Sequence, residues 1–291
     1  MNKPREILRA TTLPNMSLRN KRVLLTGANG FVGAHLTAAL KKLGANVEEF
    51  TGDIRAAQNV GDFDVVFHLA AITDLKRASE NPREVFEVNV SGTLRLLENL
   101  GSCGRFVYVS TLGVYGEPKY VPIDEDHPAR PIEPYAASKL AAEALVEGFC
   151  MSRNIPFAIA RLFNVYGRGQ RPDFVIPRLI VEISAKEEVT IRNSKSTRDF
   201  VYIDDVVEGL IAVALRGKDD IYNIGTGKET SVKKVAEIIR GFTKRKVSLI
   251  LQNESKDRGV KRSRADVRKA KKKLGWKAKV SVQKGIEKMM S

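Results

Sequence analysis

A tyrosine and a lysine four positions apart, Tyr135 and Lys139, could move a proton to or from a hydroxyl group. Residues at this spacing share one face of an α-helix, so both side chains can reach one site. The ordinary pKa of tyrosine is about 10, and a cation about 4 Å away would lower it by roughly three units at an effective dielectric constant of 20. Ser110 and Thr111 could add a hydroxyl to this site. In isolation the same spacing also describes an ordinary surface pair on a helix, so the neighbouring motifs must decide.

A glycine-rich motif, TGANGFVG at residues 26–33, joins an apolar segment to an amphipathic one. Glycines let backbone N–H groups and the positive end of a helix approach a pyrophosphate, and Gly33 would let the helix pack closely on the strand. Asp53 follows twenty residues after Gly33, as the acid of a dinucleotide-binding fold does. The motif predicts a dinucleotide site, where a positive nicotinamide ring would help Lys139 to activate Tyr135.

Asp53 is expected at the cofactor in either of two ways. Its carboxylate could accept hydrogen bonds from the adenosine ribose, or it could lie beside the adenine as part of the sequence Gly52-Asp53-Ile54. A carboxylate would repel a 2′-phosphate, which favours NAD over NADP. Arg55, two residues later, leaves NADP open.

Alternating short strands and longer helices could position these motifs. This alternation predicts an α/β fold, with a Rossmann-type doubly wound parallel sheet. The predicted sheet strands are Arg22–Thr26, Asn46–Phe50, Val65–Leu69, Arg105–Ser110, Phe157–Arg161 and Ile221–Ile224. The predicted helices are Phe31–Leu43, Pro82–Leu100, Pro134–Arg153, Ile203–Leu215 and Val232–Arg240, with two basic helices after them.

The pattern weakens after Arg161, which predicts a smaller C-terminal lobe interleaved with the first. We expect an N-terminal extension at 1–20, a dinucleotide-binding domain at 21–165 to which 199–225 return, and a substrate-binding lobe made of 166–198 and 226–291.

The formal net charge of +15 resembles that of a nucleic-acid-binding protein, but its distribution does not. Residues 1–22 hold six basic side chains against one acidic, and residues 256–288 hold fourteen against three. The body between these ends is nearly neutral. The basic run from Lys269 to Lys273 is interpreted as a solvated helix face, and neither nucleic acid nor a membrane is predicted as a partner.

The hydrophobic content and the two cysteines indicate the kind of environment in which we expect the protein to fold. The 43% hydrophobic content is ordinary for a globular chain, and the longest apolar run, near residues 64–73, is interrupted by His68. Cys103 and Cys150 have no Cys or His partner at metal-ligand spacing, so neither a disulfide framework nor a metal site is predicted. These features favour a soluble protein of the reducing cytoplasm.

Further motifs follow in a fixed order and make a family resemblance specific. From about Lys21 to Lys288 the chain resembles the extended short-chain dehydrogenase/reductase family, which includes the nucleotide-sugar epimerases and dehydratases. The matching motifs are TGANGFVG (26–33), GDIR (52–55), HLAA (68–71), NVSGT (89–93), VSTLGVYG (109–116), PYAASK (134–139), RLFNVYG (161–167), TRDFVYIDD (197–205), YNIGTG (222–227) and KKLGW (272–276).

The resemblance implies roles for matching positions. Tyr135 would be the catalytic acid/base, Lys139 would hold the nicotinamide ribose and tune Tyr135, and Thr111 would hydrogen-bond the reacting sugar oxygen. The implied cofactor-binding residues are Gly27, Asn29, Gly30, Phe31, Val32, Gly33, Asp53, Ile54, Leu69, Ala70, Ala71, Asn89, Tyr135 and Lys139. The implied substrate-binding residues are Thr111, Tyr135, Asn164, Arg198 and Arg258.

Residue types alone favour simpler roles for two of these positions. Arg198 precedes Asp199 and would then form a surface ion pair, and Asn164 would be a turn residue. The resemblance instead implies that Asn164 contacts the diphosphate region of the substrate and that Arg198 pairs with a phosphate.

The residues after Thr111 indicate the reaction. Sugar 4,6-dehydratases of the family resemble Thr-Asp-Glu here, because eliminating water needs an additional acid and base, and nucleotide-sugar decarboxylases usually show a glutamate. Leu112 and Gly113 cannot transfer a proton. The resemblance therefore favours an NAD-dependent UDP-sugar 4-epimerase of the UDP-glucose/UDP-galactose type, an isomerase in which Tyr135 serves both half-reactions.

Two other functions stay open. One is an NAD(P)-dependent keto-sugar reductase with the same residues and an exchangeable cofactor. The other is a non-catalytic nucleotide-binding regulator, for which an intact set of Tyr135, Lys139 and Thr111 has no purpose.

The chain departs from the family at two places near the expected substrate. Asn193-Ser194-Lys195 stands where Gly-Asp-Gly is common, and Arg258-Gly259-Val260 lacks the acid of Arg-x-Gly-Asp. Both departures leave the base and the sugar open. Family members usually pair helices into a four-helix bundle, so a homodimer is expected through Pro82–Leu100 and Pro134–Arg153.

Overall fold

Six parallel strands form the central sheet of the computed structural model, which describes residues 17–243, 245–252 and 260–291. Their order across the sheet is β12-β7-β6-β4-β1-β2. The strands are β1 (Arg22–Thr26), β2 (Asn46–Phe50), β4 (Val65–His68), β6 (Phe106–Thr111), β7 (Phe157–Leu162) and β12 (Ile221–Ile224). Every residue of β4 and β7 is buried, because helices cover both faces of the sheet.

The predicted sheet is confirmed in number and kind of strand. Three of the predicted strands have the bounds expected, β4 and β7 differ by one residue at one end, and β6 begins and ends one residue later than predicted. Strand β4 ends at His68, while β6 and β7 each extend one residue further, to Thr111 and Leu162. Thr111 pairs with Leu162 in the register of β6 and β7. The hydroxyl residue therefore belongs to the strand itself, at its carboxyl end.

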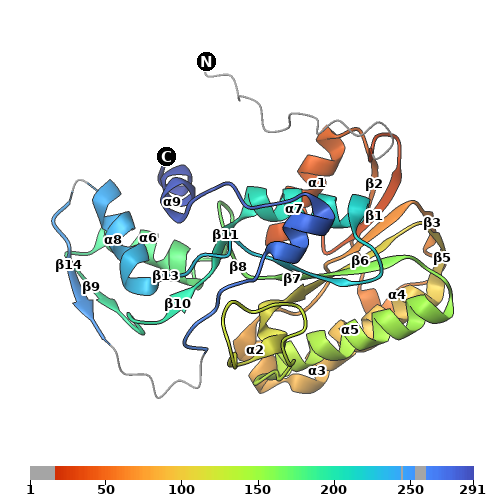
Figure 1. The fold of residues 1–291 in the computed structure, drawn as a ribbon, viewed down its shortest axis with the longest axis horizontal. Helices are drawn as coiled ribbons and strands as arrows, with labels where there is room; N and C mark the ends of the chain where they lie inside the picture. The colour runs from red at the N-terminus through yellow and green to blue at the C-terminus, as the bar shows by residue number, and fades with distance from the viewer. Residues whose placement is uncertain (1–16, 244, 253–259) are drawn as a thin grey trace.

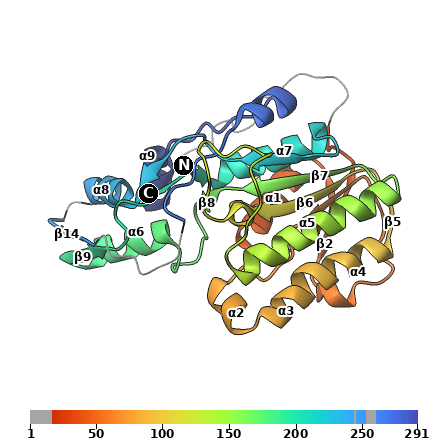
Figure 2. The same cartoon turned by 60° about the horizontal axis from the view of Figure 1, so that its bottom comes forward.

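Two layers of helices cover the sheet (Figures 1 and 2). Helices α1 (Phe31–Lys42) and α7 (Ile203–Arg216) pack side by side on one face. The other face carries α2 (Leu75–Glu80), α3 (Pro82–Phe86), α4 (Gly92–Asn99) and α5 (Pro134–Ser152). The short parallel pair β3 (Gly61–Phe63) and β5 (Leu100–Cys103) lies outside the central sheet.

The predicted single helix Pro82–Leu100 is wrong in one respect. The chain forms α3 and α4 with a π-helical turn, Glu87–Ser91, between them. A π turn is rare and often marks a functional position. Here it contains Asn89, which is buried.

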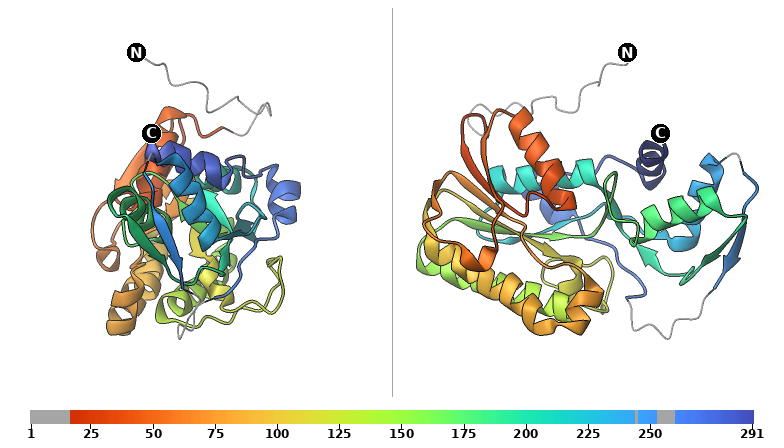
Figure 3. Two further views of the ribbon diagram at one scale, coloured as in Figure 1. Left: turned by 90° about the vertical axis from the view of Figure 1, so that its left-hand side faces the viewer. Right: turned by 180° about the vertical axis from the view of Figure 1, so that it is seen from behind.

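The smaller lobe combines short strand pairs with helices, beside the end of the sheet (Figure 3). Its elements are α6 (Val175–Ala185), β9 (Glu188–Ile191), β10 (Thr197–Arg198), β13 (Thr230–Ser231), α8 (Val232–Phe242) and β14 (Ser248–Leu251). The last elements of the chain are a second π-helical turn, Ala270–Leu274, and α9 (Val282–Met290).

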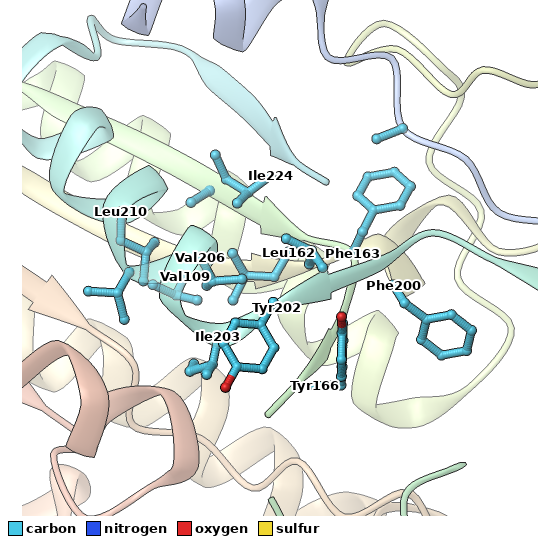
Figure 4. Close-up of a cluster of buried hydrophobic side chains, with 14 of the residues drawn as sticks. Val109, Leu162, Phe163, Tyr166, Phe200, Tyr202, Ile203, Val206, Leu210 and Ile224 are labelled. Carbon is cyan, nitrogen blue, oxygen red and sulfur yellow. The ribbon is translucent and has the colours of Figure 1, made fainter. Parts of the chain in front are cut away.

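A parallel pair, β8 (Asn164–Tyr166) and β11 (Phe200–Tyr202), connects the two lobes. Figure 4 shows the apolar cluster at this junction, where Tyr166 and Tyr202 lie near Ile203. The rings of Tyr166 and Tyr202 meet edge to face with their centroids 5.4 Å apart. This packing fixes the chain that leads from the sheet into the smaller lobe.

The domain boundaries stay a prediction. The expected return of Ile221–Ile224 to the sheet is confirmed, since β12 pairs with β7. Trp276 also contacts the larger lobe, because its indole N–H donates to the Asp205 carbonyl of α7 at 3.1 Å. In the parts of the chain that the structure describes, no helix has the length and apolarity to cross a bilayer.

Candidate active site

The glycine-rich turn lies against the end of β4. Gly27 has φ +74°, and a Cβ there would come within 2.7 Å of the Ala70 nitrogen. A Cβ on Gly33 would lie 2.0 Å from the Gly27 carbonyl oxygen, so both positions require glycine. Gly30 is the N-cap of α1, and no side chain caps the helix. The first N–H groups of α1 therefore stay available to an anion.

The other loop residues proposed for the cofactor surround this turn. Asn29 and Gly30 are exposed, and Phe31 and Val32 are partly buried at the start of α1. Leu69 and Ala70 donate their backbone N–H groups to the Thr26 hydroxyl at 3.2 and 3.1 Å. Ala71 follows them and is partly buried.

A buried hydrogen-bond chain begins at Thr26 and fixes the tautomer of His68. The Thr93 hydroxyl donates to the Asn89 carbonyl at 2.7 Å, so it accepts from Nε2–H of His68 at 2.8 Å. Nδ1 of His68 then accepts from the Thr26 hydroxyl at 2.6 Å. Burial lowers the pKa of His68 to about 3, with a smaller effect from Lys139, so the ring is neutral.

Asn89 continues this chain to the helix of Tyr135. Its side-chain amide accepts from Ile72 N–H at 2.8 Å and donates to the Ile72 carbonyl at 3.1 Å. It also donates to the Ser138 hydroxyl at 2.9 Å, which donates to the Tyr135 carbonyl at 2.7 Å. Asn89 thus holds the loop after β4 and the first turn of α5 together.

The predicted meeting of Tyr135 and Thr111 is present. The Thr111 hydroxyl accepts from Gly113 N–H at 3.1 Å, and the Thr111 side chain lies close enough to Tyr135 to act on its pKa. Burial raises the pKa of Tyr135 above its ordinary value, the charge of Glu133 raises it further, and the Thr111 side chain lowers it. Without a bound partner, Tyr135 is therefore a neutral phenol at pH 7.

Glu133 is a carboxyl group near Tyr135 that the sequence did not indicate. It is the N-cap residue of α5, and burial raises its pKa. Leu112 and Gly113, the residues after Thr111, hold no group for a second proton transfer, but Glu133 adds a carboxyl from another element.

Lys139 is 3% exposed and lies one helical turn after Tyr135. Burial lowers its pKa to about 7, and the charge of Glu143 opposes this change. Its Nζ atom lies 4.1 Å from the centroid of the Tyr108 ring. The Tyr108 and Ser110 hydroxyls are buried on β6 and have no hydrogen-bond partner within the described residues.

Asp53 does not present a free carboxylate at the end of β2. It accepts from the backbone N–H of Arg55 at 2.9 Å and from its guanidinium at 2.6 to 3.0 Å. The Arg55 side chain is therefore the main reason that the pKa of Asp53 is lowered to about 2. Ile54, between them, is buried and packs against Gly92.

Asn164 and Arg198 lie at the junction of the lobes. Asn164 begins β8 and donates to the Asp199 carbonyl at 3.3 Å and to the Ser263 hydroxyl at 3.2 Å. Nη1 of Arg198 donates to the carbonyls of Thr197 at 2.9 Å and Lys261 at 3.3 Å. Burial lowers the pKa of Arg198, which indicates a partly desolvated cation.

The simpler interpretation of Arg198 and Asp199 as a surface ion pair is wrong. Asp199 is fully buried, and its carboxylate accepts from the N–H groups of Thr226, Gly227 and Ala265 at 2.8 to 3.1 Å. Asn164 is likewise a strand residue rather than a turn residue. Arg258 lies outside the described residues.

The basic run near the C-terminus is not wholly a solvated face. Nζ of Lys269 lies 2.5 Å from an Asp220 carboxylate oxygen, and its side chain is 25% exposed. Lys271, Lys272 and Lys273 are exposed, as expected.

Comparison with known proteins places the chain in a family. The family described as GDP-mannose 4,6 dehydratase matches residues 45–289. The chain belongs to the extended short-chain dehydrogenase/reductase family. It is 32% identical to a putative UDP-glucose 4-epimerase of Methanocaldococcus jannaschii, over 92% of this chain and 97% of that protein.

Two solved structures of this family are similar throughout. One is UDP-glucuronic acid 4-epimerase from Bacillus cereus in complex with UDP-glucuronic acid and NAD, with a TM-score of 0.84, 28% identity and coverage of 92% of this chain and 98% of that one. The other is RMD from Pseudomonas aeruginosa complexed with NADPH, with a TM-score of 0.85, 25% identity and coverage of 93% and 97%. The family thus includes proteins that bind either nicotinamide dinucleotide.

Proposed function

We propose that this protein is a nucleotide-sugar 4-epimerase of the UDP-glucose/UDP-galactose type that holds NAD. The observation that carries the proposal is the position of Thr111, at the end of β6, beside Tyr135 on α5, a helix that also carries Lys139. Leu112 and Gly113, which follow Thr111, cannot transfer a proton, so the acid and base that dehydratases carry at these positions are absent here, and the Glu133 carboxyl comes from the N-cap of α5 instead.

The residues present fit a dinucleotide. A Cβ at Gly27 or Gly33 would collide with backbone, and α1 begins there without a side-chain cap. These are the features that a pyrophosphate needs. We place NAD there, with Leu69, Ala70 and Ala71 beside it and Lys139 on its nicotinamide ribose.

The chemistry follows from the protonation of the site. NAD supplies a hydride acceptor that later returns the hydride. Tyr135 removes the proton of the sugar 4-hydroxyl while Thr111 hydrogen-bonds the same oxygen. Lys139 stabilises the phenolate. After the 4-keto sugar has turned, Tyr135 returns the proton as hydride reaches the other face of C4.

The smaller lobe supplies the contacts for the nucleotide. Arg198 is a partly buried cation whose named hydrogen bonds go to carbonyl oxygens, so a phosphate would give it an anionic partner. Asn164, at the start of β8, donates to the carbonyl of Asp199, the residue that follows Arg198. We place the diphosphate of the sugar nucleotide at Arg198 and Asn164.

A keto-sugar reductase is the second candidate. The similarity to RMD complexed with NADPH and the Arg55 guanidinium on Asp53 support it, because the paired carboxylate would repel a 2′-phosphate less. In this case the cofactor would exchange at every turnover.

One experiment separates the two. Mass spectrometry of the nucleotide released on denaturation should find NAD, and NMR should show inversion at C4 in a panel of UDP-sugars. Net consumption of added NADPH with a keto sugar, without inversion of any panel member, would replace the epimerase with the reductase.

We also propose the expected homodimer through Pro82–Leu100 and Pro134–Arg153, which contain α3, α4 and α5, with α2 packed beside them. Leu75 on α2 and Phe86 on α3 are large apolar side chains that are 55% and 51% exposed. A second copy would cover them. Sedimentation should show a dimer at micromolar concentration, and a monomer there would refute the proposal.

A further inference from the structure

Three charged side chains are buried together on the side of α5 that faces the sheet. Lys139 and Glu143 on α5 and Arg161 on β7 are 3%, 2% and 4% exposed. Lys139 and Glu143 stand four residues apart, so they share a helix face. Buried charges are costly unless they are paired, so the partners of each group matter.

Glu143 and Arg161 form a two-point ion pair. Nη2 of Arg161 donates to Oε2 of Glu143 at 2.6 Å, and Nε donates to Oε1 at 3.0 Å. Both carboxylate oxygens are therefore oriented by one planar guanidinium. This contact fixes the position of the Glu143 charge relative to α5.

Arg161 is itself in contact with Tyr115, the last residue of the short 3₁₀ helix Leu112–Tyr115 that follows β6. Its guanidinium carbon lies 4.7 Å from the centroid of the Tyr115 ring. The Tyr115 hydroxyl donates to Oδ1 of the buried Asn223, on β12, at 2.7 Å. The pair therefore rests on the rigid sheet rather than on a mobile surface.

The groups that act on Lys139 come from several elements. Tyr135 and Glu143 flank it on α5, and the Tyr108 ring of β6 lies 4.1 Å from its Nζ atom. His68 of β4 interacts with it electrostatically but is neutral. Arg161 of β7 acts through Glu143. Among these groups, Glu143 is the anion that stabilises the ammonium form.

We propose that Glu143, clamped by Arg161, is a positioning residue that keeps the ammonium group of Lys139 charged beside Tyr135. Its catalytic meaning rests on the proposed function, because Lys139 must be charged to stabilise the Tyr135 phenolate. The charge relationship itself does not depend on the substrate. Neither Glu143 nor Arg161 needs to touch the cofactor or the sugar.

The substitution Glu143→Gln tests this charge directly. Glutamine can still accept a hydrogen bond from Arg161, but it leaves two buried cations without their anion. We expect the pKa of Lys139 to fall by about 1–2 units. The double substitution Glu143→Gln/Arg161→Gln removes one charge of each sign and should bring it back toward the original value.

The titration of Lys139 can be followed without an assay. The ε-carbon of labelled lysine reports protonation by NMR in the full-length protein, and Lys139→Met identifies the resonance. The matched control is Glu208→Gln, which removes a carboxylate 2.5 Å from Lys279 on the surface and should leave Lys139 unchanged.

The outcomes separate charge from structure. An unchanged Lys139 titration in folded Glu143→Gln protein overturns the proposal, even if the protein is an epimerase. If Glu143→Gln does not fold, two other variants test the proposal. Glu143→Asp should keep the Lys139 pKa within about half a unit of the wild-type value, and the double variant Glu143→Gln/Arg161→Gln should also stay near that value. A large shift in both would refute the proposal. Absence of epimerase activity would leave this titration, and its result, intact.

Discussion

Thr111 ends strand β6, and its side chain lowers the pKa of Tyr135, the second residue of α5. This contact joins a hydroxyl at the sheet edge to a phenol on a covering helix. Because Gly113 N–H donates to the Thr111 oxygen at 3.1 Å, the hydroxyl keeps its own proton to donate.

Replacing Thr111 with valine should move the pH profile of the reaction. The Thr111 hydroxyl lowers the pKa of Tyr135, so its loss should raise that pKa. Tyr135 must lose its proton to act as a base, and the acidic limb of kcat/KM should therefore move to higher pH. Tyr135→Phe should reduce kcat by about 10²- to 10⁴-fold. Steady-state kinetics from pH 6 to 10 would test both, and an unmoved limb in Thr111→Val would refute the first.

Lys139 should make the free energy of unfolding depend on pH. Its pKa is lowered to about 7 in the folded protein from 10.5, so the unfolded chain binds more protons between these values. The folded state is therefore destabilised below pH 7, and stability is gained as the pH rises from 7 to 10.5. Relative to Lys139→Met, the wild type should gain roughly 2 kcal/mol between pH 7 and 9. Urea unfolding of both proteins at pH 7 and pH 9 would measure this gain. If wild type and Lys139→Met differed by the same free energy of unfolding at both pH values, the prediction would be contradicted.

His68 should stay neutral with its proton on Nε2. Its pKa is lowered to about 3, so it contributes stability that is present above its ordinary 6.5 and is lost as the pH falls toward 3. Nitrogen-15 NMR at pH 5.5 should show a protonated Nε2 and an unprotonated Nδ1. A charged ring at that pH, or a proton on Nδ1, would refute the hydrogen-bond chain from Thr26 to Thr93.

Arg55 should tune the choice between NAD and NADP. Arg55→Ala would release the Asp53 carboxylate that Arg55 now holds, so repulsion of a 2′-phosphate should increase. We expect the ratio of NADH to NADPH affinity to rise about tenfold. Fluorescence titration with both cofactors measures this ratio. Asp53→Asn should lower the ratio of NADH to NADPH affinity. If Arg55→Ala and Asp53→Asn changed this ratio in the same direction, Arg55 would not control the choice of cofactor through Asp53.

Gly33→Ala should destabilise the protein more than the same change elsewhere. Its Cβ would lie 2.0 Å from the Gly27 oxygen, and only backbone movement relieves that contact. Such overpacking should lower the free energy of unfolding by about 1–3 kcal/mol and weaken dinucleotide binding. Gly148→Ala is the matched control in α5, because its Cβ meets nothing within 4 Å and alanine favours a helix. Thermal unfolding of both proteins tests the difference.

Much of the fold could be predicted because its signals are local. The bounds of β1, β2 and β12 follow from short apolar segments between turns, and the helix of Tyr135 follows from its apolar spacing. The π turn at Glu87–Ser91 could not be predicted, since Asn89 adopts it through contacts with Ile72 and Ser138. The spacing of four residues between Lys139 and Glu143 places both on one helix face and is visible in the sequence. Nothing in the sequence indicated that Arg161, on another element, is the partner of Glu143.

The sequence by itself determined which residues are available: a glycine turn without side chains, and a tyrosine and lysine one helical turn apart. Steric limits on glycine and the period of the helix act over a few residues, so the order of amino acids is sufficient for them. The tertiary structure decided which charges are buried and paired. It set Asp53 against Arg55, buried Asp199 under three backbone N–H groups, and placed Arg161 on Glu143. Electrostatic energies depend on distance and on exclusion of water, and only the packing of distant segments sets both.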